Sequence, residues 1–446
     1  MNDAAALTLL TDLIQKARKA GADAADAVYV EGVSLSHAQR LGAIEKLERS
    51  EAQDLGLRVL VGQRQAIVSS TDHAPKALGD LVERAVAMAR AVPEDPYIGL
   101  ADPKLLARDL PDLDLLDPVE PTPEALIERA KAAEEAARAV KGVTNSEGAE
   151  AGWGRRLIAL ATSDGFTGSY AASSHIVAVS VIAGDGLGME RDHDFASAVH
   201  GRDLDDPTAV GTRAGDKAVR RLGPRKAKSA RVPIVYDPRV SGGLLGHLAS
   251  AINGAAIARG TSFLRGKLDT AVFPEAITIV DDPHRRRGLR SKPFDGEGVA
   301  NRRRAVIDRG RLTTWLLDTR SARQLGLAST GHAARGTSSP PSPSATNLYL
   351  EAGGVTPREL MDDIASGFYV TELIGFGING ITGDYSRGAA GFWIEHGELT
   401  YPVSEVTVAG NLLEMFKQMS AANDLTFRYG VDAPTVRIEG MTMAGT

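Results

Sequence analysis

Arg156-Leu157-Ile158-Ala159-Leu160-Ala161-Thr162-Ser163-Asp164-Gly165 carries the clearest folding signal in the chain. Its apolar centre favours an extended strand, and Asp-Gly is a strong signal for a tight hairpin turn. The chain then continues with Val177, Val179 and Val181 in alternation, which places one face of a second strand against a core. This segment therefore predicts an antiparallel β-hairpin.

A helix is predicted on each side of this hairpin. Thr122-Pro123 is a suitable N-cap and first-turn pair, and it opens an Ala- and Glu-rich helix that runs to about Val140. Asp206-Pro207 opens the closing helix, and Gly223-Pro224 ends it. The order of helix, strands and helix predicts one α/β unit over residues 122–225.

Residues 1–92 show the same order of elements. A first helix has apolar residues at helical spacing and is closed by Gly21; they are Leu10, Leu13, Ile14 and Ala17. A strand alternates through Leu55, Leu57, Val59 and Val61, and a second helix carries Leu78, Leu81, Val82 and Ala85 before Pro93. A Pro- and Asp-rich connection, 93–121, follows. We expect an N-terminal α/β domain, 1–225, built by internal duplication; two unrelated units of similar order are the alternative.

The character of the sequence changes from about Arg231, where Gly and short strands dominate. Hairpins are predicted at Asp308-Arg309-Gly310 and around Gly375 to Gly380. Three helices are expected, from about Pro238 to Ala258, after the capping box Thr356-Pro357-Arg358-Glu359, and near Asn411 to Met419. The fold class is therefore α+β: N-terminal α/β units with a mixed sheet, then a mainly antiparallel β domain over 229–446, either a curved sheet or barrel-like.

The composition excludes several classes of protein. A chain of 446 residues with 43% hydrophobic and 24% charged residues is globular and long enough for two or three domains. The absence of Cys excludes disulfides, thiolate nucleophiles and Cys-ligated zinc. A net charge of −6 gives no general affinity for nucleic acid. Without a long apolar run or a secretory start, we expect a cytoplasmic protein with no membrane contact.

One basic stretch, Arg285 to Arg311, departs from this acidic balance. It has two interpretations. It contacts an anionic partner, or it is a solvated strand face whose charge is offset by Asp295, Glu297 and Asp308.

Familiar catalytic motifs are missing or incomplete. Gly375 to Gly380 matches GxGxxG, but the residues that follow predict a turn and a strand instead of the helix that a dinucleotide site needs. None of the nine histidines belongs to an HExxH pair, and no GxSxG segment occurs. His247, on an apolar helix, is typical of a hydrogen-bonded core residue, and His284, after Asp281-Asp282-Pro283, is typical of a turn with exposed carboxylates.

Two further segments have both a functional and a structural interpretation. Residues 331–347 are rich in Ser and Pro, which favour extended backbone, so they either line a groove for extended peptide or form a plain surface loop. Gly383-Asp384-Tyr385-Ser386-Arg387-Gly388 groups an acid, a phenol and a guanidinium between glycines. It is either a site or a turn with a local Asp–Arg pair.

Several of these motifs, in this order, resemble the TldD/PmbA family over nearly the whole chain. They are Asp281-Asp282-Pro283-His284, Phe294-Asp295-Gly296-Glu297-Gly298, Thr330-Gly331-His332-Ala333-Ala334-Arg335-Gly336, Thr382 to Gly388, and Pro434-Thr435-Val436-Arg437-Ile438. The resemblance is to the PmbA (TldE) branch in particular. The resemblance implies a partner of TldD type, whose zinc site combines an HExxH-type helix with a distant cysteine, and unstructured peptides as the substrate of the pair.

The sequence retains only one histidine of the zinc-binding branch. When His247 is set against the second zinc histidine, the residues upstream are Gly242 and Gly243, which supply neither a histidine nor a glutamate, and no Cys exists. We therefore expect no catalytic residue, no metal and no cofactor in this chain, and zinc in the TldD-type partner. From residue type and position within these motifs, we expect peptide or partner contacts at His247, Arg335, Asn347, Asp384, Tyr385 and Arg387. Alternatives are a homo-oligomeric peptide-binding or chaperone-like protein, a homodimer when isolated, and an independent hydrolase.

Overall fold

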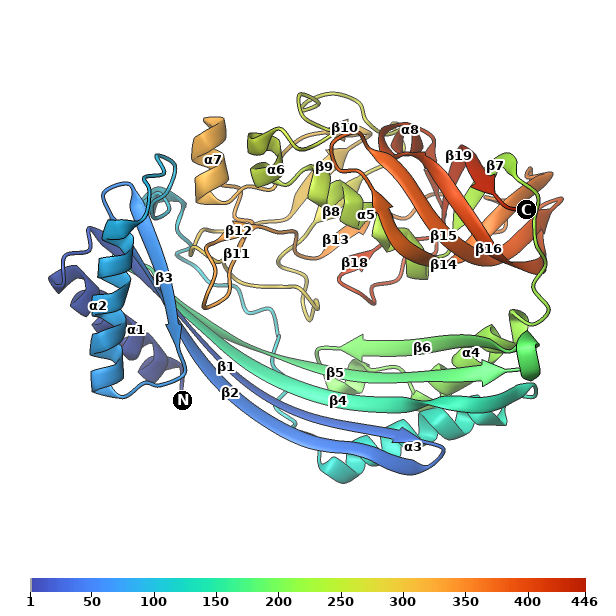
Figure 1. Cartoon of the computed structure of the whole chain (residues 1–446), viewed down its shortest axis with the longest axis horizontal. Helices are drawn as coiled ribbons and strands as arrows, with labels where there is room; N and C mark the ends of the chain where they lie inside the picture. Colours follow the sequence, from blue (N-terminus) through green and yellow to red (C-terminus); the bar gives the residue numbers. More distant parts are fainter. Residues whose placement is uncertain (1) are drawn as a thin grey trace.

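A long, curved antiparallel sheet forms the N-terminal part of the computed structural model, which describes residues 2–446 (Figure 1). Its strand order is β3-β2-β1-β4-β5-β6. The strands are β1 (Ala24–Arg40), β2 (Ala43–Val61), β3 (Arg64–Ser70), β4 (Val143–Thr162), β5 (Thr167–Ala183) and β6 (Glu190–Ala198). Every pairing in it is antiparallel, so the mixed sheet expected from the sequence is not formed in this half.

Four helices cover the outer, convex face of this sheet (Figure 1). The pair α1 (Asp3–Lys19) and α2 (Pro75–Ala91) packs on one end, and the pair α3 (Pro123–Ala139) and α4 (Pro207–Arg220) packs on the other. The order helix, three strands, helix thus occurs twice along the chain. The expected N-caps form. At the start of α3, for example, the Thr122 side chain accepts a hydrogen bond of 3.2 Å from the amide of Ala125.

The C-terminal half contains a closed five-stranded barrel, and the predicted α+β class is confirmed. Its strands follow the order β16-β15-β14-β7-β19, and a further pairing between β16 and β19 closes the ring. They are β7 (Ala230–Tyr236), β14 (Ser366–Ile378), β15 (Asp384–Glu395), β16 (Glu398–Asn411) and β19 (Val436–Ala444). The short strand β17 (Met419–Ala421) adds to β19, and α8 (Leu412–Lys417) follows β16.

A second, smaller sheet lies beside the barrel, in the order β10-β9-β8-β13-β18. Its strands are β8 (Ile279–Asp281), β9 (Arg304–Asp308), β10 (Arg311–Leu312), β13 (Leu348–Leu350) and β18 (Val431–Asp432). The hairpin of β11 (Ala333–Ala334) and β12 (Ser342–Pro343) extends from this region toward β1 and β2. Helices α5 (Pro238–Ala251), α6 (Gly254–Arg259) and α7 (Thr319–Leu325) complete it, and one large apolar core joins these elements to the barrel.

Two local expectations in this half are wrong, and a third is displaced by a few residues. The helix predicted over 238–258 is two helices, because the Asn253 side chain caps α6 and also donates a 2.8 Å bond to the carbonyl of Pro343. The capping box at Thr356 and Glu359 forms both of its bonds, but only turns follow it. The hairpin predicted around Gly375 to Gly380 forms between β14 and β15, but its turn lies at 379–383, since β14 runs through Gly375 and Gly377.

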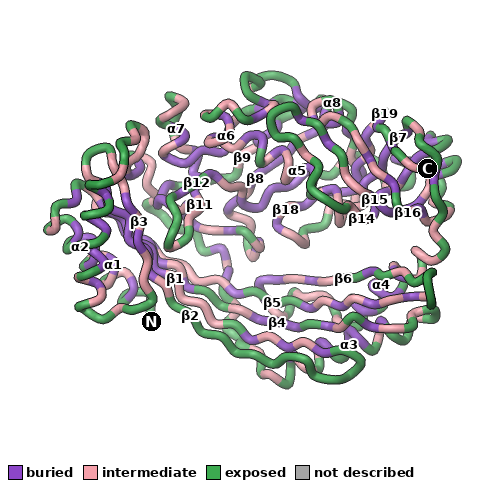
Figure 2. The backbone as a smooth tube through the Cα atoms, viewed as in Figure 1, coloured by how far each residue is buried: buried purple, intermediate pink, exposed green. Residues whose placement is uncertain are grey.

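Burial follows this layered arrangement (Figure 2). Residues 40–53, at the far end of the β1–β2 hairpin, are exposed on both faces, whereas residues 55–60 of β2 are buried on both. That end of β2 is covered by helices outside and by the C-terminal half inside. No helix among residues 2–446 is long and apolar enough to cross a membrane.

Candidate functional site

The inner, concave face of the long sheet changes from apolar to small side chains along the strands. Cross-strand neighbours form rows, and the row of Val30, Ile158 and Tyr170 lies beside the row of Val28 and Leu160. The next two rows consist mostly of small residues: Ala52, Gly32, Arg156 and Ala172, then Ser50, Ser34, Gly154 and Ser174. Small residues on a pleated surface leave room for another backbone to approach.

Two cavities lie between this face and the loops of the C-terminal half. The first, of about 370 Å³, lies over the apolar rows and beneath residues 289–296, 333–335 and 344–345. The second, of about 420 Å³, lies over the small-residue rows and beneath residues 288, 289 and 291. Arg156, Leu289 and Ser291 line both, so the two cavities adjoin each other.

The family motif around Phe294 fastens the first of these loops to the sheet. The Phe294 ring contacts Phe166 and Tyr170 edge-on, with ring centroids 5.1 and 5.5 Å apart. The Asp295 carboxylate, which is 1% exposed, accepts bonds of 2.8 Å from the amide of Val299 and 3.0 Å from that of Ala333. Burial raises the pKa of Asp295. This acid holds the loop in shape and is not free for substrate.

Two further motif acids have similar positioning roles. Glu297 accepts bonds of 2.8 and 2.7 Å from the amide and hydroxyl of Thr319, and burial together with Asp295 raises the pKa of Glu297 to about 8. Asp281 lies 3.2 Å from Nε2 of His332 and accepts a 2.6 Å bond from the amide of Thr346. These buried carboxylates connect separate loops around the cavities.

Ion pairs join the two layers at both ends of the sheet. At one end, Asp26 of β1 pairs with Arg58 of β2 and with Arg335 of the β11–β12 hairpin, and all three side chains are at most 4% exposed. Burial alone raises the pKa of Asp26, but Arg335 and Arg58 outweigh it and hold the pKa below its ordinary value. At the other end, Asp192 of β6 accepts a 2.7 Å bond from Arg239 of α5.

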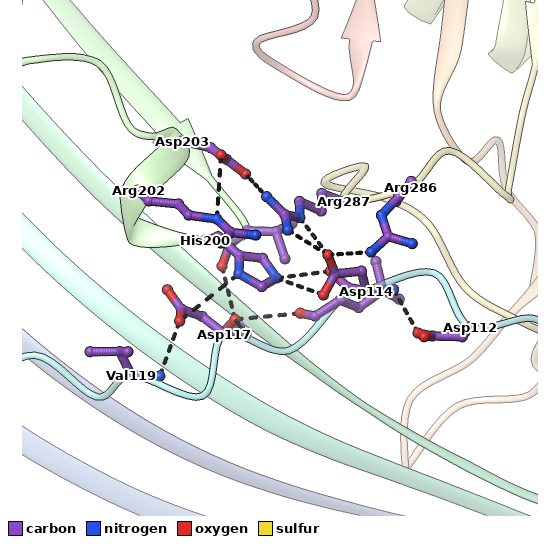
Figure 3. A network of polar contacts seen from close by, with 12 residues as sticks. Asp112, Asp114, Asp117, Val119, His200, Arg202, Asp203, Arg286 and Arg287 are labelled. Atoms are coloured by element: carbon purple, nitrogen blue, oxygen red, sulfur yellow. Dashed lines mark hydrogen bonds and ion pairs between the residues drawn. The ribbon is translucent and has the colours of Figure 1, made fainter.

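Part of the basic stretch 285–311 is ion-paired within the chain, through Arg286, Arg287 and Arg303. Figure 3 shows Arg286 and Arg287 converging on Asp114, at 2.9 and 2.6 Å, while Arg287 also reaches Asp203 at 2.8 Å. The acids that pair with Arg286 and Arg287 are therefore Asp114, in the connection 93–121, and Asp203, in a short turn after β6. Asp295 and Glu297, which the sequence suggested for this role, are buried and bonded elsewhere.

The predicted site residues fall into two separate groups, and the first lies at the cavities. Arg335 lines the first cavity, and its segment is the β11–β12 hairpin, packed against β2. Asn347 is buried and holds the loop above the cavities, because its side chain donates to the carbonyl of Asp282 (2.7 Å) and accepts from the amide of Arg290 (3.0 Å). Asn347 thus supports the site without lining either of these two cavities.

The second group lies where α5 meets β15. His247 contacts the buried ring of Tyr385 edge-on, with centroids 5.9 Å apart, and Arg387 lies on the same face of β15 as Tyr385. Burial and the nearby charge of Arg387 lower the pKa of His247. Asp384 points to the opposite face and is bonded to Thr382 (2.6 Å), so the local Asp–Arg pair suggested by the sequence does not form.

This second group does not fit a zinc ion. A catalytic zinc site needs about three protein ligands and an open position, and at α5 the neighbours of His247 are a phenol and a guanidinium. A cation such as Arg387 also repels a metal ion at short range. Across residues 2–446, no three His, Asp or Glu side chains are grouped so that they could hold a metal.

Sequence reasoning missed Asp26, Arg58 and Arg156 on the inner face. Arg58 interrupts an otherwise apolar run, Leu55 to Val61, and a charged residue in such a strand signals a buried partner. No sequence pattern singles out Arg156. Its role follows from its position on the face of β4 that the C-terminal half covers, and this is visible only in the folded structure.

Comparison with known proteins gives consistent matches along the chain. Family models described as PmbA/TldA metallopeptidase domain 1, central domain and C-terminal domain match residues 25–89, 116–222 and 229–445. The chain is 38% identical to the metalloprotease PmbA of Escherichia coli O157:H7, over 95% of this chain and 92% of that protein. A Bacteroides thetaiotaomicron structure, described as a candidate modulator of DNA gyrase, has a TM-score of 0.91 at 29% identity, covering 98% of both chains. TldE of Thermococcus kodakarensis has the same fold, with a TM-score of 0.88 at 22% identity over 98% of this chain and 100% of that chain.

Proposed function

The chain belongs to the PmbA/TldA metallopeptidase family, and from that membership we propose that it is the metal-free, peptide-binding subunit of a two-subunit metallopeptidase. In this proposal the zinc and the catalytic groups lie in a partner of TldD type. This chain holds an extended peptide between its two layers and presents it to that partner.

The observation that carries the proposal is the set of side chains on α5. On the helix that corresponds to the zinc helix of the TldD branch, Gly242 and Gly243 precede His247, and Arg387 lies nearby. One neutral histidine beside a fixed positive charge is an unfavourable place for a divalent cation. The catalytic zinc of a metallopeptidase in this family is therefore better assigned to the partner.

The adjoining cavities support the peptide-binding part of the proposal. They run from apolar side chains at Val30 and Ile158 to glycine and serine at Gly32 and Ser34, along the direction of the strands. An extended peptide alternates its side chains and exposes its backbone donors and acceptors. Apolar pockets for side chains, next to a floor of small residues, suit such a ligand.

The experiment that tests the proposal compares cleavage of an unstructured peptide by the chain alone, by a TldD-type partner alone and by the mixture, each with and without a chelator. We expect cleavage by the mixture that exceeds the rate of the partner alone and is abolished by the chelator. Cleavage by this chain alone would overturn the proposal. Binding of the peptide without any stimulation of the partner would instead favour a protein that holds peptides without cutting them.

A further inference from the structure

The first cavity has two chemically different walls. The wall formed by the sheet is apolar except for Arg156, and its apolar residues are Val28, Val30, Ile158, Leu160 and Tyr170. The wall formed by the loops carries charge, because residues 289–292 and the hairpin residue Arg335 line it. Its volume of about 370 Å³ falls within the range of about 300–1,000 Å³ found for small-ligand sites.

Four basic side chains line this one cavity. Arg156 comes from β4, Arg290 and Lys292 from the loop before Phe294, and Arg335 from the β11–β12 hairpin. Neither Arg156 nor Arg290 has a side-chain hydrogen bond or ion pair in the described part of the chain. Among residues 2–446, the one acceptor of the Lys292 ammonium is the carbonyl of Ala333, at 3.1 Å.

The acids near this cavity are already occupied. Asp295 accepts backbone amides, and its pKa is raised by burial. Asp26 is shared between Arg58 and Arg335. Even so, two guanidinium nitrogens of Arg335, Nε and Nη2, are buried without an acceptor among residues 2–446, although the side chain is only 2% exposed. Buried donors of this kind are rare and normally mark a missing partner.

We propose that this cavity binds a carboxylate of an extended peptide, with the neighbouring apolar side chain of that peptide packed against Val30 and Ile158. Arginine is suited to this role because its planar guanidinium binds a carboxylate through two parallel hydrogen bonds. The inference rests on the proposed peptide-binding function and adds a preference in substrate: the cavity selects peptides that bring a negative charge.

The carboxylate has two sources in a peptide, the C-terminus and an Asp or Glu side chain. Three unlabelled, N-acetylated peptides distinguish them when binding to the full-length chain is measured by isothermal titration calorimetry. The first is Gly-Ser-Gly-Ser-Ala-Leu with a free C-terminus, the second is the same peptide as its amide, and the third is Gly-Ser-Gly-Ser-Glu-Leu as its amide.

We expect the free-acid peptide, the Glu-containing amide, or both to bind about tenfold more tightly than the neutral amide, as one or two charge-assisted hydrogen bonds allow. A preference for the free acid alone identifies the C-terminus as the source. A preference for the Glu-containing amide alone identifies the side chain.

Substitutions show whether the preference for the charged peptide depends on this cavity or on the general surface charge of the chain. Arg290→Ala and Arg156→Ala should each remove most of the preference for the charged peptide, and both residues are exposed enough to be replaced without unfolding the chain. Arg302→Ala is the matched control, since Arg302 is an exposed arginine of the same basic stretch that does not line the cavity. Unchanged preference in Arg290→Ala and Arg156→Ala, or an equal loss in Arg302→Ala, overturns the inference.

This result is separable from the proposed function. Equal binding of all three peptides refutes the carboxylate preference, while stimulated cleavage by the mixture still supports the peptide-binding subunit. No binding of any peptide, together with no stimulation of the partner, refutes both.

Discussion

Asp26, near the start of the first strand, is ion-paired with Arg335 in the C-terminal half, and the two side chains are only 1% and 2% exposed. The same carboxylate binds Nε of Arg58 at 2.8 Å. One acid thus compensates two buried arginines and joins the two layers of the molecule beside the first cavity.

Asp26→Ala should strongly destabilise the protein. It leaves Arg58 and Arg335 buried without their shared counter-charge, and the loss of one partner from a buried ion pair typically costs about 3–5 kcal/mol. Chemical denaturation measures the change. As the control, Arg358→Ala removes an exposed pair with Glu398 and should cost less than about 1 kcal/mol. Equal effects of the two substitutions would show that the Asp26 cluster is not a buried anchor.

Gly56→Ala should loosen the β11–β12 hairpin from β2. A Cβ at Gly56 would lie 2.1 Å from the carbonyl oxygen of Thr337, so the hairpin must move. We expect a loss of about 1–3 kcal/mol in the free energy of unfolding and faster proteolysis at residues 336–341. Gly79→Ala in α2 meets nothing within 4 Å and should stabilise the protein by up to about 1 kcal/mol. Unchanged proteolysis in Gly56→Ala would contradict the close packing.

Glu297→Gln should remove one source of the pH dependence of stability. Burial and Asp295 raise the pKa of Glu297 to about 8 from an ordinary value of 4.5, so the folded state retains a proton that the unfolded state releases. As pH rises from about 4.5 to 8, this group therefore lowers the free energy of unfolding, on the order of 1 kcal/mol per pH unit, and it adds no further change above pH 8.

Urea denaturation at a series of pH values tests this expectation. The wild-type protein should lose more stability than Glu297→Gln between pH 5 and pH 8, and the two curves should run parallel above pH 8. Glu359→Gln is a suitable control, because Glu359 lies at the exposed capping box away from the cavities. Parallel curves for wild type and Glu297→Gln across the whole range would contradict a raised pKa at Glu297.

Arg387→Ala should raise the pKa of His247. Burial lowers the pKa of this imidazole first, and the positive charge of Arg387 lowers it further. A histidine-selective NMR titration measures the change, with Arg358→Ala as a control at an exposed arginine. If the pKa of His247 does not move in Arg387→Ala, the two side chains are not electrostatically coupled.

The sequence predicted local elements well where their signals are local. Thr122-Pro123 and Asp206-Pro207 open helices as expected, and Val177, Val179 and Val181 face the core. The capping box at Thr356 shows the limit of such signals: both of its bonds form, yet no helix follows, because a cap lowers the free energy of a helix that other contacts must still stabilise.

The candidate site was harder to predict because its residues act across layers. Arg156 and Arg290 line the same cavity although one lies in the first half of the chain and the other in the second. The sequence singled out Arg335 but not Asp26, its partner. In the basic stretch, Arg286 and Arg287 pair with Asp114 and Asp203. The positions of these two acids depend on how the connection 93–121 and the turn after β6 fold, and the local sequence does not show this.

Ion pairs connect the two layers at both ends of the long sheet, and under the proposed function they affect the kinetics of processing. The pairs are Asp26 with Arg335 and Asp192 with Arg239. Layers fixed to each other at two ends cannot open widely to take in a compact protein, so the rate of processing is set by how often the substrate itself exposes a free segment. A protein whose free energy of unfolding is about 4 kcal/mol does so in roughly one molecule in a thousand, and its apparent affinity falls by the same factor. Turnover would then rank substrates by their own stability more than by their sequence.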